Sequence, residues 1–186
     1  MDCETITKQY LTRFIRTING TSDTSNTLIL ILQNPAESDD IDDKTTKAIV
    51  KAIGRKYKTI IILNIIALVG KKLEDIPVNI IDKELVNIHD ENLKIIKEVL
   101  NSNLGCKILL ACGQHFIHNT VTSKVGKLYE QYFKDIYHIL ENFKERVYYI
   151  TLSAKSIKIN SKIISLPIHI KRYLSKLDES NFIQFI

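Results

Sequence analysis

Four short apolar runs, separated by segments of helical pattern, constrain the fold of this chain more than any other feature. They lie at residues 28–32, 58–64, 105–113 and 146–153 and are rich in isoleucine and leucine. Continuous apolar runs of this length are typical of strands that are buried on both faces of a sheet. Strands that alternate with helices form βα units, which give a mostly parallel sheet with helices on both faces. The sequence therefore predicts an α/β protein with a central, mostly parallel four-stranded sheet.

Four helices are predicted around this sheet. One covers residues 46–57 and is capped by an acid before it, one covers 89–101, and one opens near residue 119 and runs through Ile139. The fourth is N-terminal, because apolar residues recur at helical spacing within 4–18 and turn-forming residues at 19–26 follow them. These apolar residues are Ile6, Tyr10, Leu11, Phe14, Ile15 and Ile18.

No repeat, low-complexity segment or linker divides the chain. We expect a single α/β domain over residues 1–186, with an N-terminal helix at 1–20 and a core at 27–170.

The composition indicates a folded protein of the cytoplasm. Of the 186 residues, 45% are hydrophobic and 25% are charged, which argues against a disordered chain. No apolar run approaches the roughly 18 residues that cross a bilayer, and the first residues lack the apolar segment of a secretory signal. Three cysteines without regular spacing suit reduced thiols. We therefore expect a cytoplasmic protein with no membrane partner.

Positive charge is concentrated near the C-terminus. The formal net charge is +5, and residues 150–177 contain no acid. Such a stretch predicts contacts to the phosphates of nucleic acid, here DNA. AT-rich coding DNA gives a lysine-rich chain without that function, so both interpretations stay open. The candidate nucleic-acid-binding residues are Lys155, Lys158, Lys162, Lys171 and Arg172.

Negative charge is concentrated between residues 37 and 43. One carboxylate here could activate water, or a pair could hold a divalent cation beside phosphates. Alternatively, the run caps and solvates the following helix, and five acids would repel duplex DNA. The acids are Glu37, Asp39, Asp40, Asp42 and Asp43.

Cysteine and histidine spacing does not predict a metal site. Cys106 and Cys112 on one strand would stand roughly 20 Å apart, from six steps of about 3.3 Å. They cannot share one zinc ion, which binds its ligands at about 2 Å. His115 and His118 alone would form half a site, so no metal is predicted.

Polar residues end the predicted strands. Asn34 follows the first strand, Asn64 ends the second and Gly113 ends the third. Ligands of parallel sheets bind beyond the carboxyl ends of the strands. Each asparagine could simply satisfy loop backbone groups. If the two strands are neighbours, however, both amides should face the same cavity, with the basic stretch lining one side of it.

The motifs around these residues resemble known families. "LQNPAES", "DDKTTKAI", "IIILNIIAL" and "LLACGQH" resemble an uncharacterised family of bacterial and phage proteins with a Leu-Asn-Pro-Ser-Thr-Ala motif. The same skeleton, over residues 28–170, is similar to the uracil-DNA glycosylase superfamily. That superfamily has an Asn-Pro or Asp-Pro loop after the first strand, an asparagine ending the next strand, and a late histidine loop. The matching positions here are Asn34 with Pro35, Asn64, and His169 in "LPIHI".

This resemblance implies a three-layer α/β/α, glycosylase-like core and a set of site residues. Asn34 would orient the attacking water, and His169 would donate to the leaving base. Asn64 would read the base edge, with Gln33, Pro35 and Gly113 completing the substrate site. The chain departs from the pattern at Gln33, where a small residue is expected, and after His169, where Ile170 replaces proline. It also lacks a four-cysteine set, so no iron–sulfur cofactor is expected.

The function implied is that of a nucleobase-accommodating protein, a candidate N-glycosidic hydrolase acting on DNA. Two alternatives remain. One is a catalytically silent member of this fold that binds a protein partner, for instance in phage–host conflict. The other is an enzyme acting on free nucleosides or nucleotides, which the acidic run suits better than duplex DNA.

Overall fold

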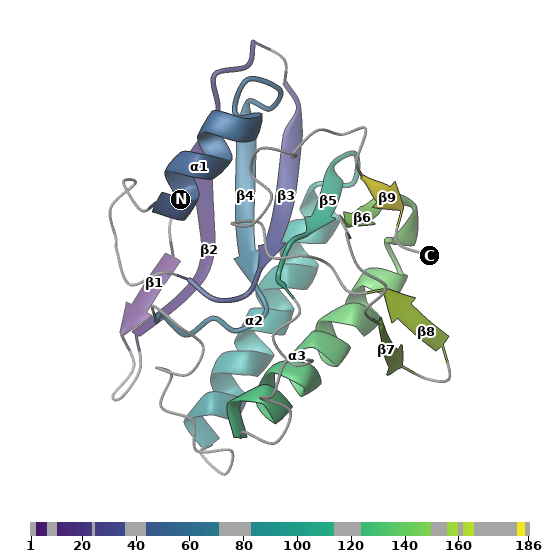
Figure 1. Cartoon of the computed structure of the whole chain (residues 1–186). Helices are drawn as coiled ribbons and strands as arrows, with labels where there is room; N and C mark the ends of the chain where they lie inside the picture. The colour runs from purple at the N-terminus through teal and green to yellow at the C-terminus, as the bar shows by residue number, and fades with distance from the viewer. Residues whose placement is uncertain are drawn as a thin grey trace.

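The chain folds around one large mixed sheet (Figure 1). The computed structural model describes residues 3–6, 11–23, 25–35, 44–70, 83–113, 124–149, 156–159, 162–165 and 182–184. Within these ranges the sheet has seven strands, in the order β1-β2-β4-β3-β5-β6-β9. Its strands are β1 (Cys3–Ile6), β2 (Leu11–Asn19), β3 (Thr27–Leu32), β4 (Thr59–Asn64), β5 (Lys107–Leu110), β6 (Val147–Tyr149) and β9 (Ile183–Gln184).

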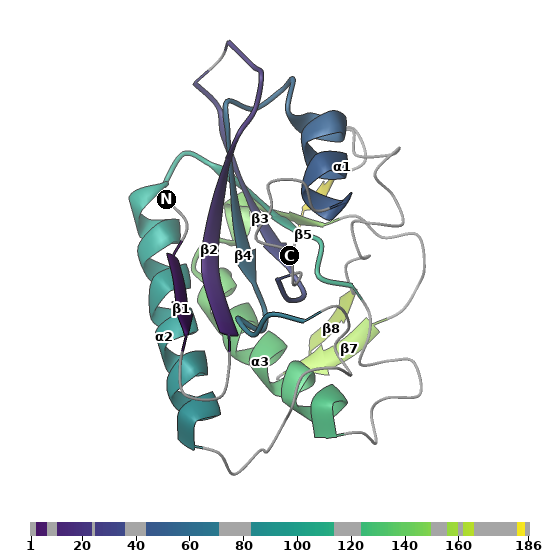
Figure 2. The same cartoon turned by 90° about the vertical axis from the view of Figure 1, so that its left-hand side faces the viewer.

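The other described elements are helices and one hairpin. The α-helices are α1 (Lys44–Ile53), α2 (Lys83–Ser102) and α3 (Lys124–Glu141), and the short 3-10 helix η3 (Lys144–Arg146) precedes β6. The strands β7 (Ser156–Ile159) and β8 (Lys162–Ser165) form a separate antiparallel pair beside α3 (Figures 1 and 2). No helix in the described parts of the chain is both long enough and apolar enough to span a membrane.

The α/β class is confirmed, but the sheet is larger and more mixed than predicted. The predicted strands correspond to β3, β4, β5 and β6, and their mutual pairings are parallel. The strands β1, β2 and β9 pair antiparallel at the two sides. Prediction failed for these three because strands that lie outside βα units carry no alternating strand–helix pattern.

The predicted N-terminal helix is wrong. Residues 11–19 form β2, whose segment 15–19 pairs antiparallel with β4. This strand is buried on both faces over most of its length, so its apolar residues do not follow a period of two. A bulge disturbs the period further, because Ile15 pairs with Cys3 while Arg13 pairs with Glu4, which leaves Phe14 as an extra residue. Together, burial on both faces and the bulge space the apolar residues of β2 in a way that resembles the spacing in an amphipathic helix.

Two apolar cores lie on opposite faces of the sheet. Leu28 and Leu30 pack with Ile49 of α1, whereas Ile29 and Ile31 pack with residues of α2 and α3. This division follows from the alternation of side chains along a strand. Figure 2 shows α1 on one side of the sheet and α2 on the other. The helices therefore cover both faces, as expected of βα units.

Helix boundaries differ from the predicted ones. The helix α1 runs from 44 to 53 rather than from 46 to 57, and Gly54 donates to Val50 O just after it ends. The helix α2 begins at residue 83, six residues before the predicted start at 89. The strand β6 is described only over 147–149.

Candidate functional site

The amides of Asn34 and Asn64 lie at the carboxyl ends of neighbouring strands. The strands β3 and β4 are parallel, with Leu32 in register with Asn64, and Asn34 follows two residues later. Both asparagines line one recess on the α1 side of the sheet, which we call the α1 recess. The described residues that line it are Arg13, Arg16, Leu32, Asn34, Pro35, Thr46, Ile49, Ile62 and Asn64.

The α1 recess is small and partly open to solvent. The space in it that admits the centre of a water molecule is about 30 Å³. One water needs roughly 10–15 Å³ of such space, so the recess has room for about two water molecules. A whole nucleobase does not fit inside it.

Two buried arginines from β2 line this recess. Arg13 is 2% exposed and Arg16 is 5% exposed. Arg16 Nη1 donates to the hydroxyl of Thr46, over 3.3 Å. The loop after β4 holds this part of β2 in place, because Arg13 N donates to Ala67 O and Val69 N donates to Leu11 O. Arginine is almost never fully buried unless it is paired, and both arginines take part in further interactions here.

The first turn of α1 adds to the positive character of the recess. Thr46 is the third residue of α1 and is buried. Free N–H groups and the helix dipole give the start of a helix a partial positive charge. Of the described residues that line the recess, none carries a carboxylate. Within the described residues, the lining of the recess is therefore either positively charged or neutral.

Asn34 holds a neighbouring loop. Its Nδ2 donates to Gly70 O at 2.8 Å and to Pro35 O at 3.2 Å. These bonds satisfy loop backbone groups, which is the plainer of the two roles considered for this residue. They also fix the amide orientation, so that Oδ1 is the atom left to accept from another molecule.

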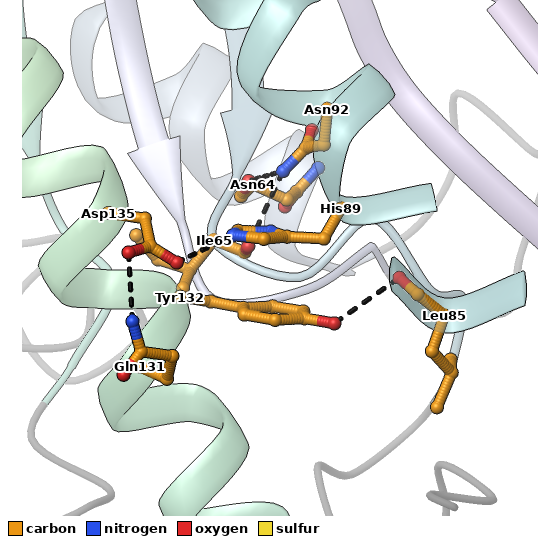
Figure 3. Close-up of polar contacts among 8 residues, drawn as sticks. All are labelled: Asn64, Ile65, Leu85, His89, Asn92, Gln131, Tyr132 and Asp135. Carbon is orange, nitrogen blue, oxygen red and sulfur yellow. Dashed lines mark hydrogen bonds and ion pairs between the residues drawn. The ribbon is translucent and has the colours of Figure 1, made fainter. Parts of the chain in front are cut away.

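Asn64 is held from the opposite face of the sheet (Figure 3). Asn92 Nδ2, on α2, donates to Asn64 O at 3.0 Å and to Ile65 O at 3.4 Å. Asn64 is 2% exposed. It lines the recess from the end of β4, and Asn92 of α2 fixes the backbone of that strand end.

A polar cluster between α2 and α3 lies beside Asn92 (Figure 3). His89 Nε2 and Asp135 Oδ2 are 2.9 Å apart, and the His89 ring stacks on Tyr132 with a centroid distance of 3.4 Å. Burial lowers the pKa of His89, although Asp135 opposes the shift. Burial also raises the pKa of Tyr132 to about 12, and its hydroxyl donates to Leu85 O. Both groups are therefore neutral at pH 7.

The other predicted site residues are distributed as follows. Pro35 lines the α1 recess with the two asparagines. Gln33 is buried but is absent from the described lining, as is Gly113, which lies three residues after the end of β5 and has a φ of 88°. Lys158 lies on β7 and Lys162 on β8. The remaining predicted residues lie outside the described residues: His169, Lys155, Lys171, Arg172 and the acidic run 37–43.

Sequence reasoning missed Arg13, Arg16 and Thr46. The available signal was "TRFIRTIN", in which two arginines stand among β-branched and aromatic residues. On the predicted helix these arginines would have been solvated. The described residues offer no candidate metal site, because they contain no cluster of three or more His, Cys, Asp or Glu side chains.

Comparison with known proteins gives a family without a known activity. No curated protein and no solved structure matches the chain. A family model described as a protein of unknown function, DUF1643, matches residues 10–156, which include β2 through β6 and every described residue lining the α1 recess. The chain belongs to the DUF1643 family.

Proposed function

We propose that the α1 recess accommodates a nucleobase-bearing ligand and that the protein is an N-glycosidic hydrolase of the DNA glycosylase type. The observation that carries this proposal is the meeting of Asn34 and Asn64 in one recess at the ends of two parallel strands. A primary amide has donors and an acceptor in one plane and can pair with the edge of a base. Asn64 is the residue proposed to read that edge.

The small volume of the recess supports different positions for base and water. The base is proposed to lie outside the opening, because about 30 Å³ is too small for it. A water molecule fits inside, where Asn34 Oδ1 can accept from it while Nδ2 remains bound to Gly70 O and Pro35 O. An amide held in this way orients a nucleophilic water without taking its proton. His169 is proposed to donate a proton to the base as the C1′–N bond breaks, and the water gives up its proton to solvent as its oxygen bonds to C1′.

The fold type forms part of the same proposal. Four parallel strands with helices on both faces support a glycosylase-like, three-layer core within residues 27–170. The sites of such sheets lie at the carboxyl ends of the strands, where the α1 recess also lies. DNA is the proposed partner, with a protein partner as the alternative if no base is released.

The direct test is a base-release assay with the full chain. Oligonucleotides carrying uracil, hypoxanthine or modified pyrimidines, and the matching free nucleosides, are incubated with protein and analysed for free base and abasic sites. The proposal expects release from at least one substrate, strongly slowed in Asn34→Ala and unchanged in Asn87→Ala, an exposed asparagine on α2. If no substrate releases a base and none binds, the interaction-module alternative replaces this proposal.

A further inference from the structure

We propose that the outer side of α1 is a docking surface for the phosphate backbone of a nucleic-acid strand. Exposed basic side chains form this surface, which we call the α1 basic face: Lys47, Lys51, Arg55, Lys56 and Lys58. The inference rests on the proposed function only in taking nucleic acid as the partner. It adds the surface that would bind the strand.

The charge of this segment is of one sign. Residues 44–58 contain six lysines or arginines and no acid. Between residues 46 and 58, every exposed side chain is basic. Lys47 and Lys56 also take part in interactions within the protein. Lys51, Arg55 and Lys58 are therefore the residues proposed to make most of the contact.

A lysine-rich composition does not explain this surface, because the other helices share the composition and not the charge pattern. On α3, Lys134 Nζ lies 2.6 Å from Glu130 Oε1, one turn away. On α2, three exposed bases are balanced by three exposed acids: Lys83, Lys94 and Lys97, and Asp90, Glu91 and Glu98. Within the described ranges, α1 is thus distinguished by an exposed side that is basic throughout.

The spacing of the charges follows the helix. Lys47 and Lys51 are four residues apart, so they lie on one face, about 6 Å apart along the axis. Gly54 N donates to Val50 O, which continues helical hydrogen bonding up to the residue before Arg55. Like charges at this spacing repel each other and weaken a helix. A row of phosphates would relieve that repulsion, and the counterions released would favour binding.

The position of α1 connects this surface to the α1 recess. Ile49 and Ile53 pack the opposite side of the helix against the sheet (Figure 2), and Thr46 and Ile49 line the recess. Lys47 directly follows Thr46, so the α1 basic face starts beside the recess. A strand bound along α1 would thus present a nucleotide at the recess. A membrane fits this face less well, because α1 exposes no apolar or aromatic side chain to insert into lipid.

Fluorescence anisotropy of the full chain with labelled single-stranded and duplex oligonucleotides tests the surface. The variant combines Lys51→Gln with Arg55→Gln, and titrations are made between about 50 and 200 mM salt. We expect the variant to bind roughly fivefold or more weakly than wild type at the lower salt. The salt slope of its affinity should be smaller by about 1.8 for duplex or 1.4 for single strands, because each lost phosphate contact removes about 0.9 or 0.7.

Two matched variants serve as controls. Lys94→Gln combined with Lys97→Gln removes the same charge from exposed positions of α2 and should bind as wild type. Lys51→Arg combined with Arg55→Lys keeps the charge and should also bind as wild type, because counterion release depends on charge. All three double variants should match the wild type in thermal unfolding, since the substituted side chains are exposed.

The surface is overturned if wild type binds no oligonucleotide. It is also overturned if the α1 variant keeps the affinity and salt slope of the α2 variant. Phosphatidylserine vesicles and poly-glutamate are parallel probes. If either binds through Lys51 and Arg55 while oligonucleotides do not, the partner is a membrane or an acidic protein and the proposal fails.

The base-release assay separates this surface from the proposed function. If oligonucleotides bind through Lys51 and Arg55 but no base is released, the surface stands and the hydrolase proposal fails. If a base is released from DNA with the same KM and salt dependence in wild type and the α1 variant, the proposed function stands and the surface is overturned.

Discussion

At the scale of single residues, Asn34 and Asn64 have separable roles. If Asn34 orients water, Asn34→Ala acts mainly on the transition state and should lower kcat by on the order of a hundredfold or more, with little change in substrate affinity. Asn64→Ala should instead reduce discrimination between bases, because an amide that pairs with a base edge separates similar bases. Steady-state kinetics on two substrates measures both effects. Equal losses of affinity in the two variants would contradict the assignment.

Asn92 contributes to stability through the end of β4. Asn92→Ala removes the donor to Asn64 O and Ile65 O, and Asn92 is 1% exposed. Leaving buried carbonyls without a donor costs about 1–3 kcal/mol, so we expect the free energy of unfolding to fall by that amount. Chemical denaturation measures it. Asn87→Ala, exposed on the same helix, is the control and should change stability by less than about 0.5 kcal/mol.

His89 makes stability depend on pH. Burial lowers its pKa in the folded state below the ordinary 6.5, so near and below that pH the unfolded chain binds a proton that the folded chain does not. The free energy of unfolding should therefore fall as pH decreases from about 7 through 6.5, until the folded pKa is reached. Asp135, Asp90 and Tyr132 surround the ring, and both carboxylates oppose the shift.

Denaturation at several pH values tests this prediction. His89→Gln should flatten the dependence between pH 7.5 and pH 5.5, because it removes the group whose pKa burial lowers. An unchanged slope in His89→Gln would assign the dependence to other groups.

At the scale of elements, the turn after β2 is packed tightly against the end of α1. Gly20 N donates to Lys58 O and Thr21 N donates to Gly54 O. A Cβ added at Gly20 would overlap Tyr57 O and approach Gly54 O to 2.6 Å. Because both atoms belong to the backbone, we expect Gly20→Ala to destabilise the fold by about 1–3 kcal/mol. Gly105→Ala is the matched control, since a Cβ there meets nothing within 4 Å. Thermal unfolding of both variants should show a loss for Gly20→Ala alone.

At the scale of the whole molecule, the basic stretch of 155–172 predicts salt-dependent binding to nucleic acid. Neutralised phosphates release counterions, so five contacts to duplex DNA would weaken binding by on the order of several hundredfold between about 50 and 200 mM salt. Fluorescence anisotropy with labelled oligonucleotides measures the slope. Joint substitution of Lys158 and Lys162 by glutamine should reduce it by about two counterions. The same change at Lys94 and Lys97, which are exposed on α2, should leave it unaltered.

The parallel centre of the sheet could be predicted because its signal is local. β3, β4 and β5 are short apolar runs, and burial on both faces requires such a run whatever surrounds it. β6 is a shorter apolar run whose two tyrosines are half-buried. The meeting of Asn34 and Asn64 follows from the same local information, because neighbouring parallel strands bring their carboxyl ends to one edge. Their chemical roles, like that of His169, stay predictions.

The sequence by itself thus determined the α/β class, the four central strands and the pair of amides at their ends. Only the tertiary structure decided that residues 11–19 are a strand, because its partners, β1 and β4, are chosen by contacts that no helical or alternating pattern encodes. It also decided where Arg13 and Arg16 lie, because one extra residue in β2 reverses the face of every side chain beyond it. Side-chain direction in a strand depends on register, and register is a property of the pair of strands rather than of either one alone.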